Sequence, residues 1–288
     1  MRLLVFGRTG QVATELARLC PADWQITCLG REAADLHNPE ACAAAIRDSA
    51  AEAVINAAAY TSVDAAETEE ALAAIVNGAA PTAMARAAAG RRIPFLHVST
   101  DYVFDGSGTA PWLPDAPRRP LGAYGRTKLA GEDGVRGAGG THAILRTSWV
   151  FSAHGANFVK TMLRMDCRQD TLRIVSDQIG GPTAAVDIAE ALLVIVRALA
   201  ADPAKTGIYH FAGTPDTSWE GFAREIFARA GMAVTVTGIP SAEYPTPARR
   251  PLNSRLDCSA TETVFGLPRP DWRTGLARVL EDLSESGK

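Results

Sequence analysis

Short apolar runs alternate with alanine-rich stretches of helical periodicity along the first half of the chain. The runs that predict buried strands are RLLVFG (2–7), QITCLG (25–30), AVINAAA (53–59), IPFLHVST (93–100) and THAILRTSWVF (141–151). The stretches that predict helices are QVATELARLC (11–20), PEACAAAIRDSA (39–50), residues 66–90 and the segment around Tyr124. Because helical crossovers join parallel strands, this alternation predicts a doubly wound α/β fold.

The pattern changes after Phe151. Helical stretches continue, but proline- and glycine-rich links such as QIGGPT (178–183) and YPTPARRP (244–251) separate them. We therefore expect a main domain over residues 1–151 and a smaller α/β lobe over residues 152–288. This boundary is not expected to be clean, because AVDIAEALLVIVRAL followed by GIYHFAG indicates that residues 171–212 return in part to the main sheet.

The charge balance narrows the classes of partner. The 288 residues carry a formal net charge of −3, and no basic cluster is larger than a short pair such as Arg249-Arg250. Nucleic acids and anionic membranes bind clustered Lys and Arg, so we exclude both as main partners. The longest apolar run, IAEALLVIVRALAA (188–201), contains Glu190 and Arg197 and is too short to span a bilayer. The N-terminus does not have the pattern of a signal peptide, and we expect a cytoplasmic protein.

Cysteine and histidine spacing indicates neither a disulfide framework nor a metal site. The five cysteines lack C-x-x-C spacing, which predicts reduced thiols at Cys20, Cys28, Cys42, Cys167 and Cys258. No H-x-x-x-H spacing occurs among the five histidines, which are His37, His97, His142, His154 and His210. We therefore assign no metal ligand from the residues alone.

A glycine-rich turn directly follows the first predicted strand and opens the first predicted helix. Its sequence, GRTGQVA (7–13), has the spacing G-x-x-G-x-x-A. Glycine permits positive φ and close approach of a pyrophosphate, and the helix N-terminus offers free N–H groups to the negative charge. The turn therefore predicts a Rossmann-type dinucleotide-binding domain, with cofactor contacts at Gly7, Thr9, Gly10, Gln11 and Val12.

The end of the second predicted strand bears on the choice of cofactor. Sites that prefer NAD place an acid there to bind the ribose 2′-hydroxyl, whereas Leu29-Gly30-Arg31 contains none. Arg31 can instead pair with a 2′-phosphate, which favours NADPH, although NADH stays open. Asp35 and Leu36 are candidate contacts for the adenine.

Small and polar residues follow the next two predicted strands. Ala57, Ala58 and Ala59 allow the cofactor to pass close to the backbone, and Tyr60 and Thr61 come next. The following strand ends in Val98, Ser99, Thr100 and Asp101. Because ligands of doubly wound sheets bind at the carboxyl ends of the strands, we expect all of these residues to face one crevice.

Tyr124 and Lys128 are four residues apart on a predicted helix, which places them one above the other on one face. Taken alone, the pair is equally typical of two amphipathic side chains on a solvated surface. Its position after Ser99-Thr100-Asp101, and downstream of a dinucleotide turn, favours a proton-transfer role instead.

The motifs GRTGQVA, INAAAYTSVDAAE, STDYVFDG, YGRTKLAGE, LRTSWVF, NFVKTMLR, DQIGGPT and YPTPARRPLNSRLD occur in this order. Together they resemble the dTDP-4-dehydrorhamnose reductase family, within the extended short-chain dehydrogenase/reductase superfamily. The resemblance runs from the first strand to about Asp257. The glycine turn and Y-x-x-x-K are general to the superfamily, whereas STDYVFDG, RTSWVF and the ARRP segment are particular to the 4-ketosugar reductases.

The resemblance implies an NAD(P)H-dependent oxidoreductase that reduces the C4 ketone of dTDP-4-dehydro-β-L-rhamnose (dTDP-6-deoxy-L-lyxo-4-hexulose) to dTDP-L-rhamnose. Tyr124 would protonate the C4 oxygen, Lys128 would lower the pKa of Tyr124 and hold the nicotinamide ribose, and Thr100 would orient the ketone. The alternatives are a nucleotide-sugar epimerase, a reductase of other C4 stereochemistry such as a 6-deoxytalose-forming one, and a non-catalytic regulatory subunit.

The same resemblance gives Thr100, Asp101, Tyr124 and Trp149 contacts to the sugar nucleotide. An indole after a strand end also offers an apolar wall with one donor, which suits a deoxysugar or a base. In the second lobe, Arg249, Arg250, Asn253 and Ser254 lie on a proline-rich loop where an arginine can hold a diphosphate. Asn157, Phe158 and Thr183 are weaker candidates for the substrate cleft.

Some members of the family depend on magnesium held by acidic side chains that bridge a dimer, so the resemblance implies a homodimer and Mg²⁺ as candidates. Glu15 and a C-terminal acid such as Asp282 are present here. However, Ala184-Ala185-Val186 stands where a further acid is expected. Because the set is incomplete, we do not expect a bridging metal.

Overall fold

Six parallel strands form the central sheet of the computed structural model, which describes residues 1–165 and 171–285. The strands are β1 (Arg2–Phe6), β2 (Gln25–Leu29), β3 (Ala53–Asn56), β4 (Phe95–Thr100), β5 (His142–Thr147) and β10 (Gly207–His210). They lie in the order β10-β5-β4-β3-β1-β2. The order reverses between β1 and β3, and ligands of doubly wound sheets bind at such a switch point. The predicted fold class is confirmed.

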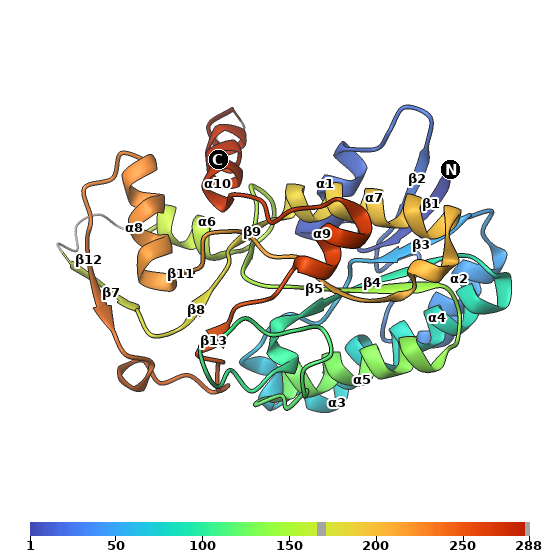
Figure 1. Ribbon diagram of the computed structural model, residues 1–288, viewed down its shortest axis with the longest axis horizontal. Coiled ribbons are helices and arrows are strands. Elements are labelled where there is room, and N and C mark those ends of the chain that lie inside the picture. The colour runs from blue at the N-terminus through green and yellow to red at the C-terminus, as the bar shows by residue number, and fades with distance from the viewer. Residues whose placement is uncertain (166–170, 286–288) are drawn as a thin grey trace.

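Helices cover both faces of this sheet, as Figure 1 shows. They are α1 (Gln11–Arg18) and α7 (Ala185–Ala201) on one face, and α2 (Pro39–Asp48), α4 (Ala80–Arg91) and α5 (Ala123–Gly137) on the other. Alternate residues of a strand point to opposite faces. Accordingly, Leu3 and Val5 pack with α1 and α7, whereas Leu4 and Phe6 pack with α2, α4 and α5. Burial of both faces explains why β1 is apolar from Leu3 to Phe6.

The alanine-rich stretch predicted as helical over 66–90 is divided into several pieces. They are η1 (Ala65–Glu67), α3 (Glu70–Ala74), a π-helical turn η2 (Ile75–Ala79) and α4. Within the π-helical turn, the Asn77 side chain accepts from the Tyr60 backbone N–H at 2.9 Å and donates to the Thr127 hydroxyl at 3.2 Å. The interruption therefore ties the segment after β3 to helix α5.

A second hydrophobic core lies beside the main sheet. Its elements are β6 (Val150–Phe151), α6 (Phe158–Leu163), β7 (Thr171–Val175), β9 (Thr183–Ala184), α8 (Trp219–Arg229), β12 (Thr235–Ile239) and α10 (Trp272–Glu285). The short strands β8 (Ile179–Gly180), β11 (Thr217–Ser218) and β13 (Asn253–Ser254) form a separate three-stranded sheet. Helix α9 (Ser259–Phe265) and the short turns η3 (Asp101–Val103), η4 (Pro203–Lys205) and η5 (Ser241–Glu243) complete the elements of the described ranges. In Figure 1, α6 and α8 lie at the opposite end of the molecule from β2.

The chain crosses between the two cores more than once. Strand β7 pairs with β12, away from the main sheet, but α7 and β10 then return to that sheet, within the expected range 171–212. The domain boundary near residue 152 itself stays a prediction. Four cysteines in the described ranges are free thiols, whereas Cys167 lies outside those ranges. In the described part of the chain, no helix combines the length and apolar character needed to cross a membrane.

Candidate active site

A cleft of about 990 Å³ opens at the carboxyl ends of the central strands. It brings together most of the residues singled out from the sequence: Gly7, Thr9, Gly10, Gln11, Val12, Arg31, Asp35, Leu36, Ala57, Ala58, Ala59, Tyr60, Thr61, Val98, Ser99, Thr100, Asp101, Tyr124, Lys128 and Trp149. Seven predicted substrate residues lie outside its lining: Asn157, Phe158, Thr183, Arg249, Arg250, Asn253 and Ser254. The cleft also includes Arg8, Thr147 and Trp219, which the sequence had not indicated.

The glycine turn after β1 has the geometry that a pyrophosphate requires. Gly7 has φ +109°, and a Cβ there would stand 3.2 Å from the backbone nitrogen of Ala58. The N–H groups of Gly7 and Arg8 donate to the carbonyl oxygen of Leu29 at 3.0 and 3.2 Å, which fixes the turn. Gly10 caps α1 without a side-chain hydrogen bond, so the helix N-terminus presents backbone N–H groups to the cleft. These residues fit a dinucleotide.

Charged side chains surround the end of β2. Arg8 forms an ion pair with Glu32 at 2.8 Å, and Arg31 lines the cleft beside them. Glu32 directly follows Leu29-Gly30-Arg31, the strand end that contains no acid. Asp35 accepts from the backbone N–H of His37 at 3.0 Å and contacts its Nδ1 at 2.6 Å, and these contacts lower the pKa of the carboxyl group. Two guanidinium groups and one exposed carboxylate therefore lie where a 2′-phosphate or a 2′-hydroxyl would be recognised.

Tyr124 and Thr100 meet at the centre of the cleft. Thr100 ends β4, and its hydroxyl accepts from the Tyr102 N–H at 3.2 Å and donates to Asp101 Oδ1 at 3.1 Å. Burial raises the pKa of Tyr124 to about 12, partly opposed by a hydrogen bond with Thr100, while the nearby Asp101 raises it further. The phenol is thus kept protonated throughout the neutral range, and the lowering of its pKa expected from Lys128 is not found, because burial dominates.

Lys128 lies one helical turn after Tyr124, and its side chain is buried. The amine donates to the carbonyl oxygen of Val98 at 2.7 Å and lies 3.4 Å from Nε2 of His97. Burial lowers the pKa of Lys128 to about 8, with the negative charge of Glu132 acting in the opposite direction. The amine can therefore change protonation within the working range of an enzyme.

Asp101 is a buried carboxyl group, 2% exposed, and its Oδ2 has no hydrogen-bonding partner among the described residues. Burial raises its pKa to about 6, whereas the side chains of Ser254 and Thr100 act to lower it. Ser254 therefore approaches the site from β13, although it does not line the cleft. A buried carboxylate with an unpartnered oxygen is an available acceptor for a ligand hydroxyl.

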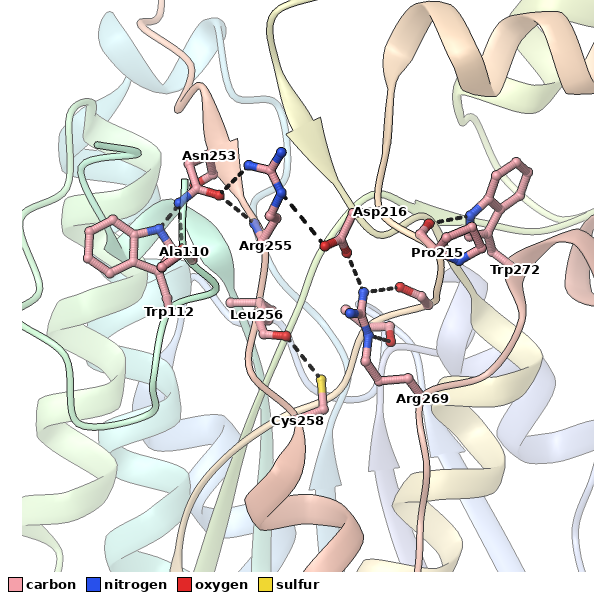
Figure 2. A network of polar contacts seen from close by, with 12 residues as sticks. Ala110, Trp112, Pro215, Asp216, Asn253, Arg255, Leu256, Cys258, Arg269 and Trp272 are labelled. Carbon is pink, nitrogen blue, oxygen red and sulfur yellow. Dashed lines mark hydrogen bonds and ion pairs between the residues drawn. The ribbon is translucent and has the colours of Figure 1, made fainter. Parts of the chain in front are cut away.

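A polar network holds β13 in place (Figure 2). Asn253 Nδ2 donates to the carbonyl oxygen of Ala110 at 2.8 Å, and its Oδ1 accepts from the Arg255 backbone N–H at 3.3 Å. Arg255 and Arg269 both pair with Asp216. The network thus engages both ends of the Asn253 amide within the protein and fixes the position of the neighbouring Ser254.

The two predicted arginines differ in their surroundings. Arg250 forms a two-pronged pair with Asp64, with Nη1 at 3.1 Å and Nη2 at 2.8 Å from the carboxylate oxygens. Arg249 is exposed. Asp64 also accepts from the Ala248 N–H at 3.1 Å, so it organises this loop. Arg250 is therefore engaged by Asp64, whereas the side chain of Arg249 is directed to solvent.

Asn157 joins the glycine turn to the second core. Its Nδ2 donates to Gln11 Oε1 at 2.9 Å and to the Ser152 carbonyl oxygen at 2.8 Å, while its Oδ1 accepts from the Lys160 N–H and caps α6. Its polar atoms therefore bind other parts of the chain. The predicted role of Asn157 in substrate binding stays a prediction.

An aromatic wall forms at the second-lobe end of the cleft. Trp149 has φ +50°, a conformation uncommon for a bulky residue, and its ring stacks on Trp219 with centroids 3.7 Å apart and planes at 12°. Phe158 packs against Trp219, with ring centroids 4.7 Å apart. The strained backbone at Trp149 is offset by this packing, which presents a flat apolar surface to the cleft.

The acids considered for magnesium are occupied by cations of the chain. The Glu15 carboxylate contacts Arg18 at 2.8 Å and His154 at 3.4 Å. Glu190 and Asp282 also act on Arg18 and raise its pKa. Within residues 1–165 and 171–285, no three His, Cys, Asp or Glu side chains are grouped so that they could hold a metal ion. The arrangement around Arg18 does not fit a metal centre.

Comparison with known proteins places the chain in a family. The sequence model of the RmlD substrate binding domain matches residues 1–285. The dTDP-4-dehydrorhamnose reductase of Sinorhizobium fredii is 43% identical, covering 100% of this chain and 99% of the relative. The crystal structure of the enzyme of that name from Clostridium acetobutylicum has a TM-score of 0.92 at 33% identity, over 99% of this chain and 100% of the other.

A second solved structure, dTDP-4-dehydrorhamnose reductase from Bacillus anthracis in complex with NADP, has a TM-score of 0.90 at 31% identity. The matched region covers 98% of this chain and 99% of the Bacillus anthracis chain. Full-length matches to the family model, to a curated relative and to solved structures agree with the motifs found in the sequence. The chain therefore belongs to the dTDP-4-dehydrorhamnose reductase family.

Proposed function

We propose that this protein reduces the C4 ketone of dTDP-4-dehydro-β-L-rhamnose to dTDP-L-rhamnose with NADPH. The relatives named above carry this activity in their names, and one of them was solved with NADP. The observation that carries the proposal is the meeting of Tyr124 and Thr100 in a cleft that also contains Lys128 and the glycine turn. A proton donor, a ketone-orienting hydroxyl and a dinucleotide site are thus combined.

The cofactor site is assigned to the residues of the cleft nearest the switch point. Bound NADPH supplies the hydride for the ketone carbon. The turn from Gly7 to Val12 would hold its pyrophosphate, and Arg8 and Arg31 would pair with the 2′-phosphate. Ala57, with the small residues after it, would leave room for the cofactor beside β3. Lys128 would hold the nicotinamide ribose.

The residues of the chain then divide the remaining chemistry. On substrate binding, the Thr100 hydroxyl would turn from Asp101 to donate to the ketone oxygen and hold it beside Tyr124. The Tyr124 phenol would pass its proton to that oxygen. The raised pKa of Tyr124 keeps this donor protonated at neutral pH. The Lys128 ammonium would stabilise the phenolate that remains.

The substrate end of the cleft contains groups suited to a deoxysugar nucleotide. Asp101 would accept from a sugar hydroxyl through its unpartnered oxygen, and Trp149 would pack on the apolar face of the sugar. Trp219, which stacks on Trp149, is a further candidate for this wall. Arg249 would contact the diphosphate, while Arg250, Asn253 and Ser254 would shape the loop around it.

The test is NADPH oxidation with dTDP-4-keto-6-deoxyglucose supplied together with its 3,5-epimerase, which forms the proposed substrate. NMR of the product should show the rhamno configuration at C4. The talo configuration would identify a 6-deoxytalose-forming reductase. An epimerase would consume no NADPH, and a regulatory subunit would form no product.

The assembly and compartment are separate parts of the proposal. A homodimer stays a prediction from the family resemblance, and sedimentation equilibrium of the purified protein tests it. The cytoplasm is the compartment we propose, since the reaction consumes NADPH and a nucleotide sugar, and fluorescence microscopy of a tagged chain tests that location.

A further inference from the structure

A chain of buried polar side chains leads from the end of β3 to Lys128. Asn56 and His97 are each 1% exposed, and they lie on neighbouring strands of the sheet. Nδ2 of Asn56 lies 3.2 Å from Nδ1 of His97, and Nε2 of His97 lies 3.4 Å from the amine of Lys128. A buried polar side chain destabilises the fold unless its hydrogen bonds are made. The contacts of Asn56 and His97 therefore indicate which atoms donate and which accept.

The contacts of Asn56 determine which nitrogen of His97 carries the proton. The backbone N–H of Ala58 lies 3.1 Å from one side-chain atom of Asn56, and since an N–H can only donate, that atom is Oδ1. The amide nitrogen of Asn56 therefore faces His97 and donates to Nδ1. Because Nδ1 accepts, a neutral His97 carries its proton on Nε2.

Neutral His97 is the form that burial favours. Burial and the charge of Lys128 both lower the pKa of His97 well below its usual value. Its Nε2–H is thus directed at Lys128, and an N–H cannot accept a proton from an ammonium group. Of the acceptors that contact the Lys128 amine, the Val98 carbonyl oxygen at 2.7 Å remains.

We propose that His97 is a positioning residue for Lys128. Its Nε2–H closes the inner side of the amine, so that the ammonium directs one proton to Val98 and the others toward the cleft, where the cofactor ribose and Tyr124 lie. The neutral amine, in contrast, can accept from Nε2–H, so His97 also makes loss of the Lys128 proton easier. This role rests on the proposed reductase function.

The other charged and titratable groups near Lys128 are few. Glu132 lies one turn further along α5 and favours the ammonium form, but its carboxylate is bound by Arg146 of β5 at 2.7 and 2.9 Å and by Ser99 of β4 at 2.6 Å. Tyr124 lies on the same helix, and its phenol stays protonated. From the η2 turn, the neutral Asn77 contacts Thr127 rather than the amine. His97 is thus the group whose donor faces the amine directly.

The first experiment follows the fall of kcat/KM at alkaline pH, which loss of the Lys128 proton produces. In His97→Gln, the side-chain amide can turn its oxygen to the ammonium, so this alkaline limb should move up by roughly one pH unit. His142→Gln is the matched control, because His142 is a buried histidine at the start of the neighbouring strand β5, with its Nδ1 2.7 Å from the Gly140 carbonyl oxygen. Its alkaline limb should match that of the wild type. A limb that does not move in His97→Gln would overturn the proposal.

The second experiment reads the tautomer of His97 in the wild-type protein itself. Two-bond ¹H–¹⁵N correlation NMR of the ¹⁵N-histidine-labelled wild-type protein should show His97 as the neutral Nε2–H tautomer, identified as the signal missing from His97→Gln or Asn56→Asp. An Nδ1–H tautomer or an imidazolium would contradict the role assigned here. In Asn56→Asp the carboxylate can only accept, so the proton should move to Nδ1. Because the tautomer is read without substrate, a failure of this inference is distinguishable from an absence of ketosugar reduction in the wild type.

Discussion

The amine of Lys128 donates to the carbonyl oxygen of Val98 at 2.7 Å, and this bond joins helix α5 to strand β4. Tyr124 lies one turn earlier on the helix, and Thr100 lies two residues further along the strand. A single buried contact therefore helps to set the separation of the proposed proton donor from the hydroxyl that orients the ketone. Precise placement of such groups is worth several kcal/mol in a transition state.

The two glycines of the cofactor turn should respond differently to alanine. At Gly7, with φ +109°, an added Cβ meets the backbone of Ala58 at 3.2 Å, so Gly7→Ala should lower the free energy of unfolding by about 1–3 kcal/mol. At Gly10, with φ −72°, the atom nearest to an added Cβ is 3.9 Å away. Gly10→Ala should therefore change the free energy of unfolding by less than about 0.5 kcal/mol. Both variants should raise the KM for NADPH at least tenfold, that is by about 1.4 kcal/mol or more. Urea denaturation and steady-state kinetics measure the two effects, and equal stability losses would refute this account of the turn.

The activity should fall at alkaline pH. The pKa of Lys128 is lowered to about 8 by burial, so the ammonium is lost as the pH rises through that value, while Tyr124, with a pKa of about 12, keeps its proton. We therefore expect kcat/KM to decrease about tenfold for each pH unit above about 8. A profile that stays flat to pH 10 would show that the Lys128 proton is not needed.

Asp101→Asn should stabilise the protein while reducing its activity. Burial raises the pKa of Asp101 from 3.8 to about 6, so the stability contributed by this group is fully present below about pH 3.8 and is lost as the pH rises through about 6. Asparagine carries no charge, and the gain in unfolding free energy over the wild type should grow between pH 4 and 7, to roughly 3 kcal/mol. Urea denaturation at both pH values measures the gain. A gain that does not change with pH would contradict the assignment.

The buried pair of Glu132 and Arg146 should be far more important for stability than an exposed pair. Both side chains are 0% exposed, and Glu132→Gln leaves the guanidinium buried without its counter-charge, which should cost about 3–5 kcal/mol of unfolding free energy. Glu70→Gln is the matched control, since Glu70 and Arg126 pair at 2.8 Å with side chains 44% and 46% exposed, and it should cost less than about 1 kcal/mol. Similar values from urea denaturation would mean that burial does not decide the strength of these pairs.

Local sequence patterns were sufficient to place most of the cleft. One rule, that parallel strands end at the same edge of a sheet, brings together three features of the sequence. They are the glycines Gly7 and Gly10 after β1, the small residues after β3 and the hydroxyl groups after β4. Tyr124 and Lys128 needed only the helical repeat. The family resemblance and the fold class are confirmed, and the roles of the individual residues stay predictions.

Other features depend on contacts between distant segments, which no local pattern contains. Trp219 reaches the cleft because α8 packs beside β6, 70 positions after Trp149 in the sequence. Arg250 is a residue type that binds diphosphates, but its pairing with Asp64 depends on how two loops distant in the sequence meet. His97 lies in an apolar strand and is typical of a core residue by sequence. Its relation to Lys128 appears only when α5 is packed on β4.

The central claim is that Tyr124 donates a proton in this cleft, and replacing it tests that claim most directly. Wild-type protein and Tyr124→Phe would be compared by NADPH oxidation with the ketosugar formed from dTDP-4-keto-6-deoxyglucose and its 3,5-epimerase, with fluorescence titration of NADPH as the control for cofactor binding. We predict that kcat/KM falls roughly 10²–10⁴-fold while NADPH affinity is retained. Turnover by Tyr124→Phe at the wild-type rate would contradict the account.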